Sequence, residues 1–431
     1  MIKKLVIVFV AIIAIQSYGQ EGTASPYSFY GIGNQKFKGT VENRSMGGLS
    51  IYSDSIHVNL RNPSSYAGKN LDILNNESRP VKFAVGGSYT STSLKSDTSK
   101  DKASASSFDY LAMSIPMGDF GFGFGLIPYT SVGYKLEAYR DDEQIENRFN
   151  GEGGINKAFL GFGYQLTSGL SIGVDFQYNF GNIQNSITEY VYDSEGDPIE
   201  RQSRENNRSD LSGLNFNLAA TYKAMLNEKL ELVTSVTYRP ESNLTSKNER
   251  SISTITTTTT NVEYALSTIE TDLGNLQETE LVLPSRISYG LGIGQPRKWF
   301  VGVESEYSKT SDFSNALYSN GATYEDQTAF KLGGFYIPKY NSFSSYAKRI
   351  VYRAGFHYEN TGLNIENESI NEFGMSFGLG LPVGSFFSNA NLGVEVGKRG
   401  TTNSNLIQEN FVNFQLSLSL NDRWFNKRKF D

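Results

Sequence analysis

The sequence predicts an all-β fold, a transmembrane antiparallel β-barrel of about 14 strands, and three observations support this prediction. Apolar and polar residues alternate in many stretches, as in LSIGVDFQYNF at residues 170–180, and a period of two is typical of an extended strand. The strands are expected to run about nine to thirteen residues, which suits a tilted bilayer crossing. Short turns also alternate with long polar connections. A soluble β-sandwich or propeller, the alternative, usually has strands of five or six residues and needs no such asymmetry.

Residues 1–19 have the pattern of a secretory signal peptide. Two lysines precede the apolar run 5–15, and Ser17 and Gly19 stand at the −3 and −1 positions before Gln20. The run is too short to span a bilayer. We therefore expect export across the inner membrane, and the absence of cysteine after the run excludes a lipid-anchored lipoprotein.

Residues 20–78 lack the period of two and carry glycine and proline punctuation in SPY, GIG, MGG and NPS. They precede the first alternating stretch, on the side where the chain enters the barrel. We expect this segment to form a periplasmic hatch or plug inside the lumen. The barrel itself is predicted over residues 79–421.

Fourteen stretches carry the strand pattern, two of them more weakly than the rest. They are 81–89, 108–117, 120–126, 160–166, 170–180, 214–223, 230–239, 287–293, 299–307, 330–337, 352–359, 373–381, 392–397 and 412–420. The turns after the second, fourth, sixth and eighth are tight, at 117–119, 167–169, 225–228 and 295–298. Long polar loops are expected at about 91–107, 141–157, 181–213, 240–285 and 309–328. In outer-membrane barrels the short turns are periplasmic and the long loops extracellular.

The third stretch is interrupted by Pro128 and Tyr129 before Val132, Tyr134 and Leu136 resume the alternation. Proline removes a donor from the hydrogen-bond ladder, so it belongs at a bulge, a kink or an opening in the sheet. An alternative stays open, in which the strand ends at about residue 127 and residues 132–139 form part of a loop or a fifteenth strand.

The residues expected to face the lumen are small or charged. Glycines alternate in GFGFG at 121–125, which leaves room for a plug or a ligand to approach closely. Charged residues of both signs are predicted to form paired networks that hold a plug, rather than a selectivity ring of one sign. They are Lys82, Asp175, Lys223, Glu231, Arg239, Glu304, Glu306, Lys331, Arg353 and Glu395.

The composition argues against several classes of function. The formal net charge of −6 provides no basic excess for a nucleic-acid partner. The chain has no cysteine and only His57 and His357, so we expect no metal site, no cofactor, no catalytic residue and no enzymatic activity. The mean hydropathy of −0.37 does not fit a bundle of transmembrane helices. In the tail, residues 422–431, the aromatic pair Trp424–Phe425 and the basic run predict anchoring at the membrane interface, and a plain solvated tail is the alternative.

The stretch RSMGGLSIYSDSIHVNLRNPSSYA (44–67) resembles the outer-membrane transporters of hydrophobic compounds of the FadL and TodX type. That family has a glycine-rich stretch after an arginine and then an Asn-Pro-Ala motif. LPSRISYGLGI (283–293) and YRAGFHYENTG (352–362) resemble its late strands. The matching residues are Arg44, Met46, Gly47 and Gly48 in the first motif and Asn62, Pro63 and Ser64 in the second, with serine in place of alanine.

The resemblance implies a fourteen-stranded barrel with a hatch in its lumen, for which a Gram-negative outer membrane is expected. Such barrels take up fatty acids or aromatic hydrocarbons passively and release them sideways through a gap at a kinked strand, here at Pro128 and Tyr129. Expected partners are membrane lipid and a hydrophobic small molecule. The alternative is a non-transporting barrel whose loops and tail bind proteins of an outer-membrane secretion or assembly complex. A general polar porin is disfavoured, because residues 20–78 would block its lumen.

Overall fold

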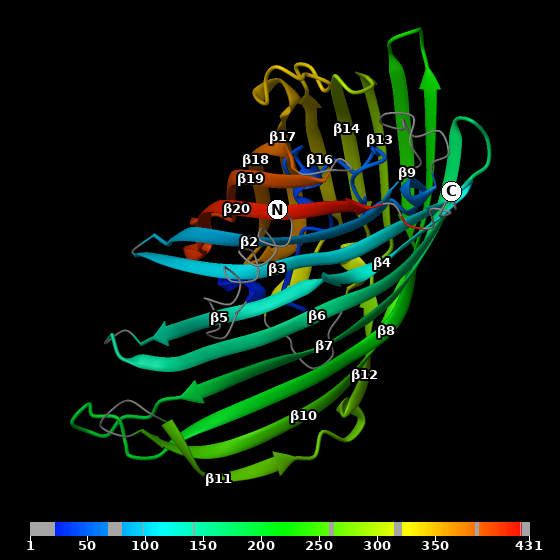
Figure 1. Ribbon diagram of the computed structural model, residues 1–431. Helices are drawn as coiled ribbons and strands as arrows, with labels where there is room; N and C mark the ends of the chain where they lie inside the picture. Colours follow the sequence, from blue (N-terminus) through cyan, green and yellow to red (C-terminus); the bar gives the residue numbers. More distant parts are fainter. Residues whose placement is uncertain are drawn as a thin grey trace, which may run out of the picture.

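The computed structural model describes residues 22–67, 80–97, 99–140, 143–257, 263–313, 321–383, 388–422 and 424. Its described residues form a closed, antiparallel β-barrel with 14 wall strands (Figure 1). None of the helices in these ranges has the length and apolar character to cross a membrane. The predicted signal peptide lies outside the described residues, as do residues 68–79 and most of the tail.

Ten wall strands are continuous and four consist of two pieces. The continuous strands are β2 (Val81–Lys95), β3 (Lys100–Met117), β6 (Ile145–Gln165), β7 (Leu170–Glu189), β8 (Gln202–Met225), β14 (Trp299–Ser308), β17 (Val351–Ile365), β18 (Glu368–Pro382), β19 (Asn389–Arg399) and β20 (Gln408–Asp422). The divided strands are β4 (Phe120–Pro128) with β5 (Thr130–Tyr139), β9 (Glu231–Arg239) with β10 (Ser242–Thr257), β12 (Glu278–Leu283) with β13 (Arg286–Gln295), and β15 (Ala322–Tyr324) with β16 (Gln327–Tyr336).

The remaining elements are short. β11 (Glu263–Thr271) pairs with β10 beyond the rim, and β1 (Asn34–Gln35) lies in the N-terminal segment. The helical turns are η1 (Pro26–Phe29), α2 (Val41–Arg44), η2 (Pro63–Tyr66), η4 (Gly274–Leu276), η5 (Thr310–Asp312), η6 (Ala347–Arg349) and η7 (Asn403–Asn405).

The sheet closes between its first and last wall strands. β2 pairs with β20 in one unbroken register from Val81↔Asp422 to Lys95↔Gln408. Each of the fourteen predicted stretches coincides with a wall strand, apart from one terminal residue at 166, 230 and 337, so the predicted fold class is confirmed. The open alternative at Pro128 is also decided, because β4 and β5 both pair with β6 and are separated only by Tyr129. They are one interrupted strand.

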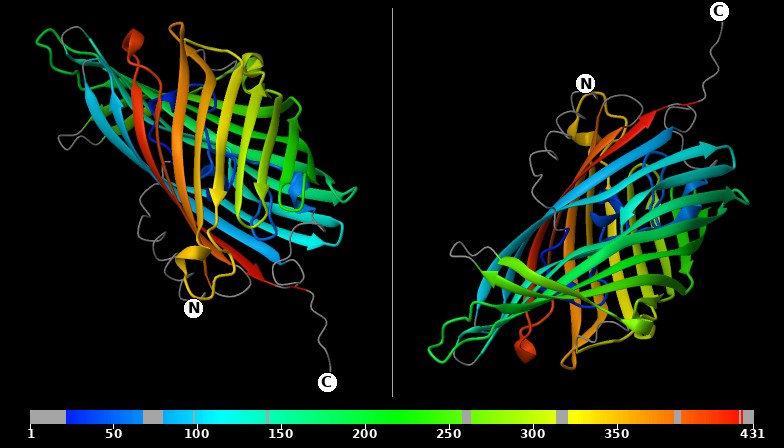
Figure 2. Two further views of the ribbon diagram at one scale, coloured as in Figure 1. Left: turned by 90° about the horizontal axis from the view of Figure 1, so that it is seen from above. Right: turned by 90° about the horizontal axis from the view of Figure 1, so that it is seen from below.

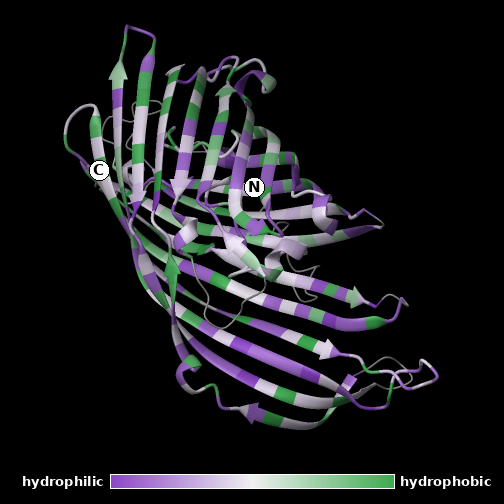
Figure 3. Cartoon of the chain, turned by 180° about the vertical axis from the view of Figure 1, so that it is seen from behind, coloured by the Kyte–Doolittle hydropathy of each residue, from purple (hydrophilic) through white to green (hydrophobic). Residues whose placement is uncertain are grey.

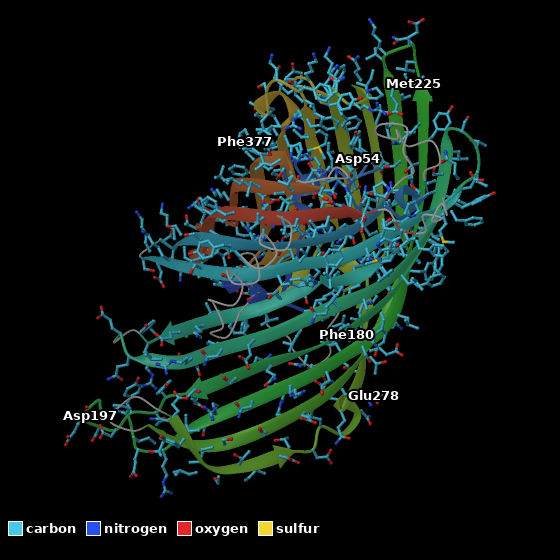
Figure 4. All side chains as sticks on the ribbon, viewed as in Figure 1. Asp54, Phe180, Asp197, Met225, Glu278 and Phe377 are labelled. Carbon is cyan, nitrogen blue, oxygen red and sulfur yellow. The ribbon has the colours of Figure 1, made fainter. Side chains whose placement is uncertain are left out.

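The connections confirm the predicted turns and correct the predicted loops. The four tight turns lie at one end of the barrel, which we call the turn end, and the other end is the loop end. Figure 4 shows Met225 and Asp197 at these opposite ends. The predicted loop 91–107 is wrong in extent, because β2 and β3 continue until only residues 96–99 separate them. Beyond the bilayer both faces of a strand meet water, so the ladder continues while the apolar signal disappears.

The distribution of side chains is the reverse of that in a soluble protein. On β7, Phe176 and Tyr178 are 55% and 48% exposed on the outer face, whereas Asp175 and Asn179 are 1% and 0% exposed inside. The same alternation runs along other wall strands in Figure 3. An apolar exterior around a polar interior is what lipid requires of a closed barrel. The acyl chains therefore meet the apolar face.

The interior is filled by residues 22–67, which we call the inner segment. Figure 2 shows it, in blue, within the wall in two views. Met46, Leu49 and Ile51 pack on Val233 and Phe300 of the wall in one apolar cluster. A second cluster joins inner-segment residues to β2, β3, β4 and β6. The hydrophobic core of this protein therefore lies inside the barrel, between the wall and the inner segment.

Candidate functional site

The first contact of the inner segment with the wall is built on a short helix and a glycine turn. Thr40 caps α2 in a reciprocal pair of bonds with Asn43, and the chain then reverses through Gly47 and Gly48. These glycines have φ angles of 68° and 85°, the left-handed region that glycine adopts without a steric penalty. The Asn43 amide donates to the carbonyl oxygen of Leu49 at 2.8 Å and so fixes the turn.

This turn lies directly on the backbone of β16, β17 and β18. The Gly47 N–H donates to Ser376 Oγ at 3.0 Å. A Cβ on Gly333 or Gly355 would collide with the backbone of Met46 and Gly47, so wall glycines permit the contact. Arg44 Nε donates to Glu395 Oε2 at 2.5 Å. The structure therefore brings together the four residues of the first predicted motif.

The second motif contacts a different part of the wall. Asn62 caps η2 through a bond from Ser64 N to its Oδ1 (3.1 Å), and its amide donates to Thr221 Oγ1 on β8 (2.9 Å). Ser64 Oγ lies 2.7 Å from the same threonine oxygen, so the serine that replaces alanine adds a hydrogen bond. Pro63 and Tyr66 complete this contact.

Inward-facing glycines of β4, β6 and β7, which we call the floor of glycines, lie against η2. The Tyr66 ring occupies the space that a Cβ on Gly123 or Gly161 would need, and Pro63 does the same at Gly173. This confirms that the alternating glycines leave room for close approach. Tyr66 itself was not singled out from the sequence, because an aromatic residue outside a periodic stretch gives no directional signal.

Buried carboxylates on β14 connect the inner segment to several strands. Glu304 and Glu306 are 1% and 5% exposed. Glu306 accepts bonds from Arg61, from Arg286 at 2.5 Å and from Lys331 at 2.9 Å. Glu304 accepts from the N–H and the hydroxyl of Ser50 at 2.7 and 2.8 Å. The predicted networks of mixed sign are confirmed here.

The two histidines lie in separate clusters. His357 Nε2 is 3.3 Å from Glu372, and its Nδ1 is 3.4 Å from the Glu395 that binds Arg44. His57 Nδ1 is 2.7 Å from Asp54 Oδ2 in the inner segment. Burial would raise the pKa of Asp54, but the imidazole of His57 outweighs it and the pKa lies below the ordinary value. Among the described residues no group of histidine and carboxylate side chains is arranged to hold a metal ion.

The wall is interrupted at Pro128 and Tyr129. The β3–β4 ladder ends at Leu111↔Leu126, and β5 runs away from β3 (Figure 1). Three residues, 129–131, oppose only residues 154 and 155 of β6, which is a bulge. Within the described residues, positions 100–110 of β3 pair with β2 alone.

The inner segment partly covers this interruption. β1 pairs with the free side of β5 through Asn34↔Ser131 and Gln35↔Thr130, and Lys36 N donates to the carbonyl oxygen of Tyr129 at 3.0 Å. A cavity of about 120 Å³ lies between β1 and the inner faces of β2 and β3. A second, of about 230 Å³, contacts Tyr129, and a third, of about 800 Å³, reaches the turn end.

Comparison with protein families matches the BamG family over residues 1–431, the whole chain. The chain belongs to the BamG family. No curated protein matches this BamG-family chain in sequence.

Solved structures share its fold. The toluene transporter TodX of P. putida is 16% identical, with a TM-score of 0.60, and the match covers 90% of this chain and 100% of that one. The toluene transporter TbuX of Ralstonia pickettii is 13% identical, with a TM-score of 0.56 and coverage of 90% and 100%. A FadL homologue of Pseudomonas aeruginosa is 10% identical, with a TM-score of 0.53 and coverage of 88% and 97%. The resemblance to the FadL and TodX type is confirmed, and at these identities it is a likeness of fold.

Proposed function

We propose that this barrel lies in the outer membrane of a Gram-negative cell and carries a hydrophobic small molecule, without catalysis or a cofactor. In this proposal the inner segment is a hatch, and the molecule leaves sideways between β3 and β5. The supporting observation is the interrupted ladder at Pro128, which lies beside the inner segment rather than in a random part of the wall. The similar structures named as toluene transporters give independent support.

The route requires β1 to move, because β1 occupies the free side of β5. Few backbone bonds hold it there, whereas the wall strands β6 and β7 share a ladder of 19 pairs. The 120 Å³ cavity beside β1 is lined by hydroxyl and charged side chains as well as apolar ones. A wholly apolar ligand would therefore displace β1 rather than pass it.

A disulfide lock tests the proposal, because the chain has no cysteine of its own. Gln35 and Thr130 are Cα partners, so the pair Gln35→Cys and Thr130→Cys would join β1 to β5. The matched control joins two wall strands through Ser93→Cys and Asn410→Cys. Oxidation of the first pair should lower the uptake of labelled toluene and oleate by cells at least tenfold, and reduction should restore it. Unchanged uptake by the oxidised first pair would contradict lateral release past β1.

A second candidate function is a non-transporting subunit that binds partner proteins in an outer-membrane secretion or assembly complex. The connection between β16 and β17, residues 337–350, favours it. This connection is at the turn end but is much longer than the turns there, and Phe343 on it is fully exposed. It contains Lys339, Lys348 and Arg349 and no acidic residue, so it suits an acidic protein surface.

Co-purification in mild detergent separates the two functions. If the subunit role holds, Phe343→Ser should lose a stoichiometric partner, while Phe377→Ser on the lipid-facing side of β18 should retain it. If transport holds, both variants should take up labelled toluene like the parent protein. A barrel that copurifies with lipid alone argues against the subunit role.

A further inference from the structure

The break in the wall coincides with an accumulation of positive charge. Around the ring of Tyr129, Lys38 Nζ and Lys157 Nζ each lie 4.4 Å from the ring centroid, and Arg239 Cζ lies at 6.0 Å. These cations come from the inner segment, β6 and β9, so three separate parts of the chain place them there. Cation–π contacts with one ring stabilise them only partly, since the ring carries no net charge.

Several of the polar groups here have no hydrogen-bond partner although they are buried. They are Lys38 Nζ, Arg239 Nε and Arg286 Nε. Arg239 is 5% exposed, and its two other nitrogens donate to Tyr129 Oη and to the carbonyl oxygen of Pro284. The nearest shared carboxylate, Glu306, already accepts from Arg61, Arg286 and Lys331. Buried donors without acceptors are uncommon in folded proteins and indicate a missing group.

An open space adjoins two of these groups, Lys38 and Arg286. Lys38, Tyr129 and Arg286 line the cavity of about 230 Å³ between the inner segment and the loop end. Lysines and arginines outnumber carboxylates around it by seven to four. Burial lowers the pKa of Lys38 well below the ordinary lysine value, and Arg286 and Arg239 lower it further. A negatively charged ligand in the cavity would offset both the burial of these cations and their mutual repulsion.

We propose that this cavity, at Lys38, Arg286 and Tyr129, is an oxyanion site that takes a phosphate group, carried on an apolar chain or free. A phosphate suits it better than a carboxylate, because the local excess is several positive charges and a phosphate monoester carries nearly two negative ones. The inference deepens the proposed function, since it makes the transported molecule an anionic amphipath rather than a neutral hydrocarbon. The strand break beside the site would accept the apolar chain.

Calorimetric titration of the full chain in a neutral maltoside detergent tests this. The probes are hexyl phosphate, hexanoate, hexanol and inorganic phosphate, of which the first three share the same chain length. Hexyl phosphate should bind at least tenfold more tightly than hexanol, with hexanoate between them. Inorganic phosphate that binds as tightly as hexyl phosphate would assign the site to the free ion, whereas weaker binding assigns it to the headgroup of an amphipath.

Variants locate the binding. Lys38→Met should weaken the binding of hexyl phosphate at least tenfold, and Lys38→Arg should restore most of it. Lys348→Met, which removes an exposed lysine at the turn end, is the matched control and should bind like the parent protein. Equal affinity for hexyl phosphate and hexanol, or parental affinity in Lys38→Met, would overturn the proposal.

Binding to the purified protein is independent of transport. If uptake fails while hexyl phosphate still binds at Lys38, the result contradicts the proposed transport function and supports the phosphate site. If toluene uptake persists without any phosphate binding, the result supports transport and contradicts the phosphate site.

Discussion

Two of the contacts between the inner segment and the wall use different chemistry. At Arg44–Gly48 the contact combines an ion pair with a glycine turn pressed against wall backbone. At Asn62–Tyr66 it is uncharged, and a proline and an aromatic ring lie on a floor of glycines while hydroxyl groups form a small network. The ionic network of Glu304 and Glu306 lies between the two. A charged contact can be released by a competing ion, whereas a steric contact can be released only by movement.

The largest effect is expected from Glu306→Gln. The change leaves Arg61, Arg286 and Lys331 with one carboxylate fewer in a buried place, which costs about 3–5 kcal/mol for a broken buried pair. We expect a lower unfolding temperature of the purified barrel in detergent. Glu249→Gln, on an exposed part of β10, is the control. Equal unfolding temperatures of the two variants would show that the network contributes little.

Gly47→Ala should come next. A residue with a side chain pays about 1–3 kcal/mol in this backbone region, and the new Cβ would also meet the backbone of Phe356. Gly118 offers a matched control, because its φ is 63° but nothing lies near its missing Cβ. The difference in unfolding temperature between Gly47→Ala and Gly118→Ala therefore measures the contact with the wall. No difference would mean that the turn does not press on β17.

Asn62→Ala should cost about 1–2 kcal/mol, because it removes the cap of η2 and leaves Thr221 without its amide donor. Limited proteolysis reports this change most directly. The inner segment should be cut faster between residues 50 and 67 than in the parent protein. Asn243→Ala, at an exposed amide on β10, should leave the pattern unchanged. Parental cutting rates in Asn62→Ala would argue against an anchoring role.

Ser64→Ala should have the smallest effect, about 0.5–1.5 kcal/mol, because the hydroxyl loses its neutral hydrogen bonds to Thr221 and to Asn62 Oδ1, while the backbone bond from Ser64 N to Asn62 is kept. The variant restores the Asn-Pro-Ala form of the motif. In combination with Thr221→Val the two losses should be less than additive, since both variants remove the Ser64–Thr221 bond, whereas only Thr221→Val removes the bond from the Asn62 amide. Full additivity in a double-mutant cycle of unfolding temperatures would show that the bond is not made.

The wall strands could be predicted from the sequence far better than the contacts of the inner segment. The fourteen stretches are visible because lipid on one face and a polar lumen on the other impose a period of two, and Phe176 beside Asp175 shows this directly. The loop-end extensions of β7 and β8 were missed because water on both faces removes the contrast. Pro128 indicated an interruption of the wall, but not that β5 leaves β3, since that depends on pairing between distant strands.

The inner segment was predicted as a region but not as a set of partners. Lys38, Arg61 and Ser50 stand outside any periodic stretch, so their neighbours cannot be inferred from spacing. The wall partners of Ser50 and Arg61, Glu304 and Glu306, were identified as lumen-facing, because they lie in a strand. The motif residues were found through the family resemblance, and in the structure the two motifs contact different parts of the wall.

The pairing of β1 with β5 has an energetic consequence. In the part of the chain that the structure describes, Asn34, Gln35 and Lys36 supply the backbone bonds to Ser131, Thr130 and Tyr129, and each such bond is worth about 0.5–1.5 kcal/mol net. Detaching them would cost a few kcal/mol, so the uncovered form would be a rare but recurring species, of the kind that exchanges in microseconds to milliseconds. In the proposed lateral route, this short pairing, together with the bond from Gly133 N to Ser28 Oγ, would set how often the free side of β5 is uncovered.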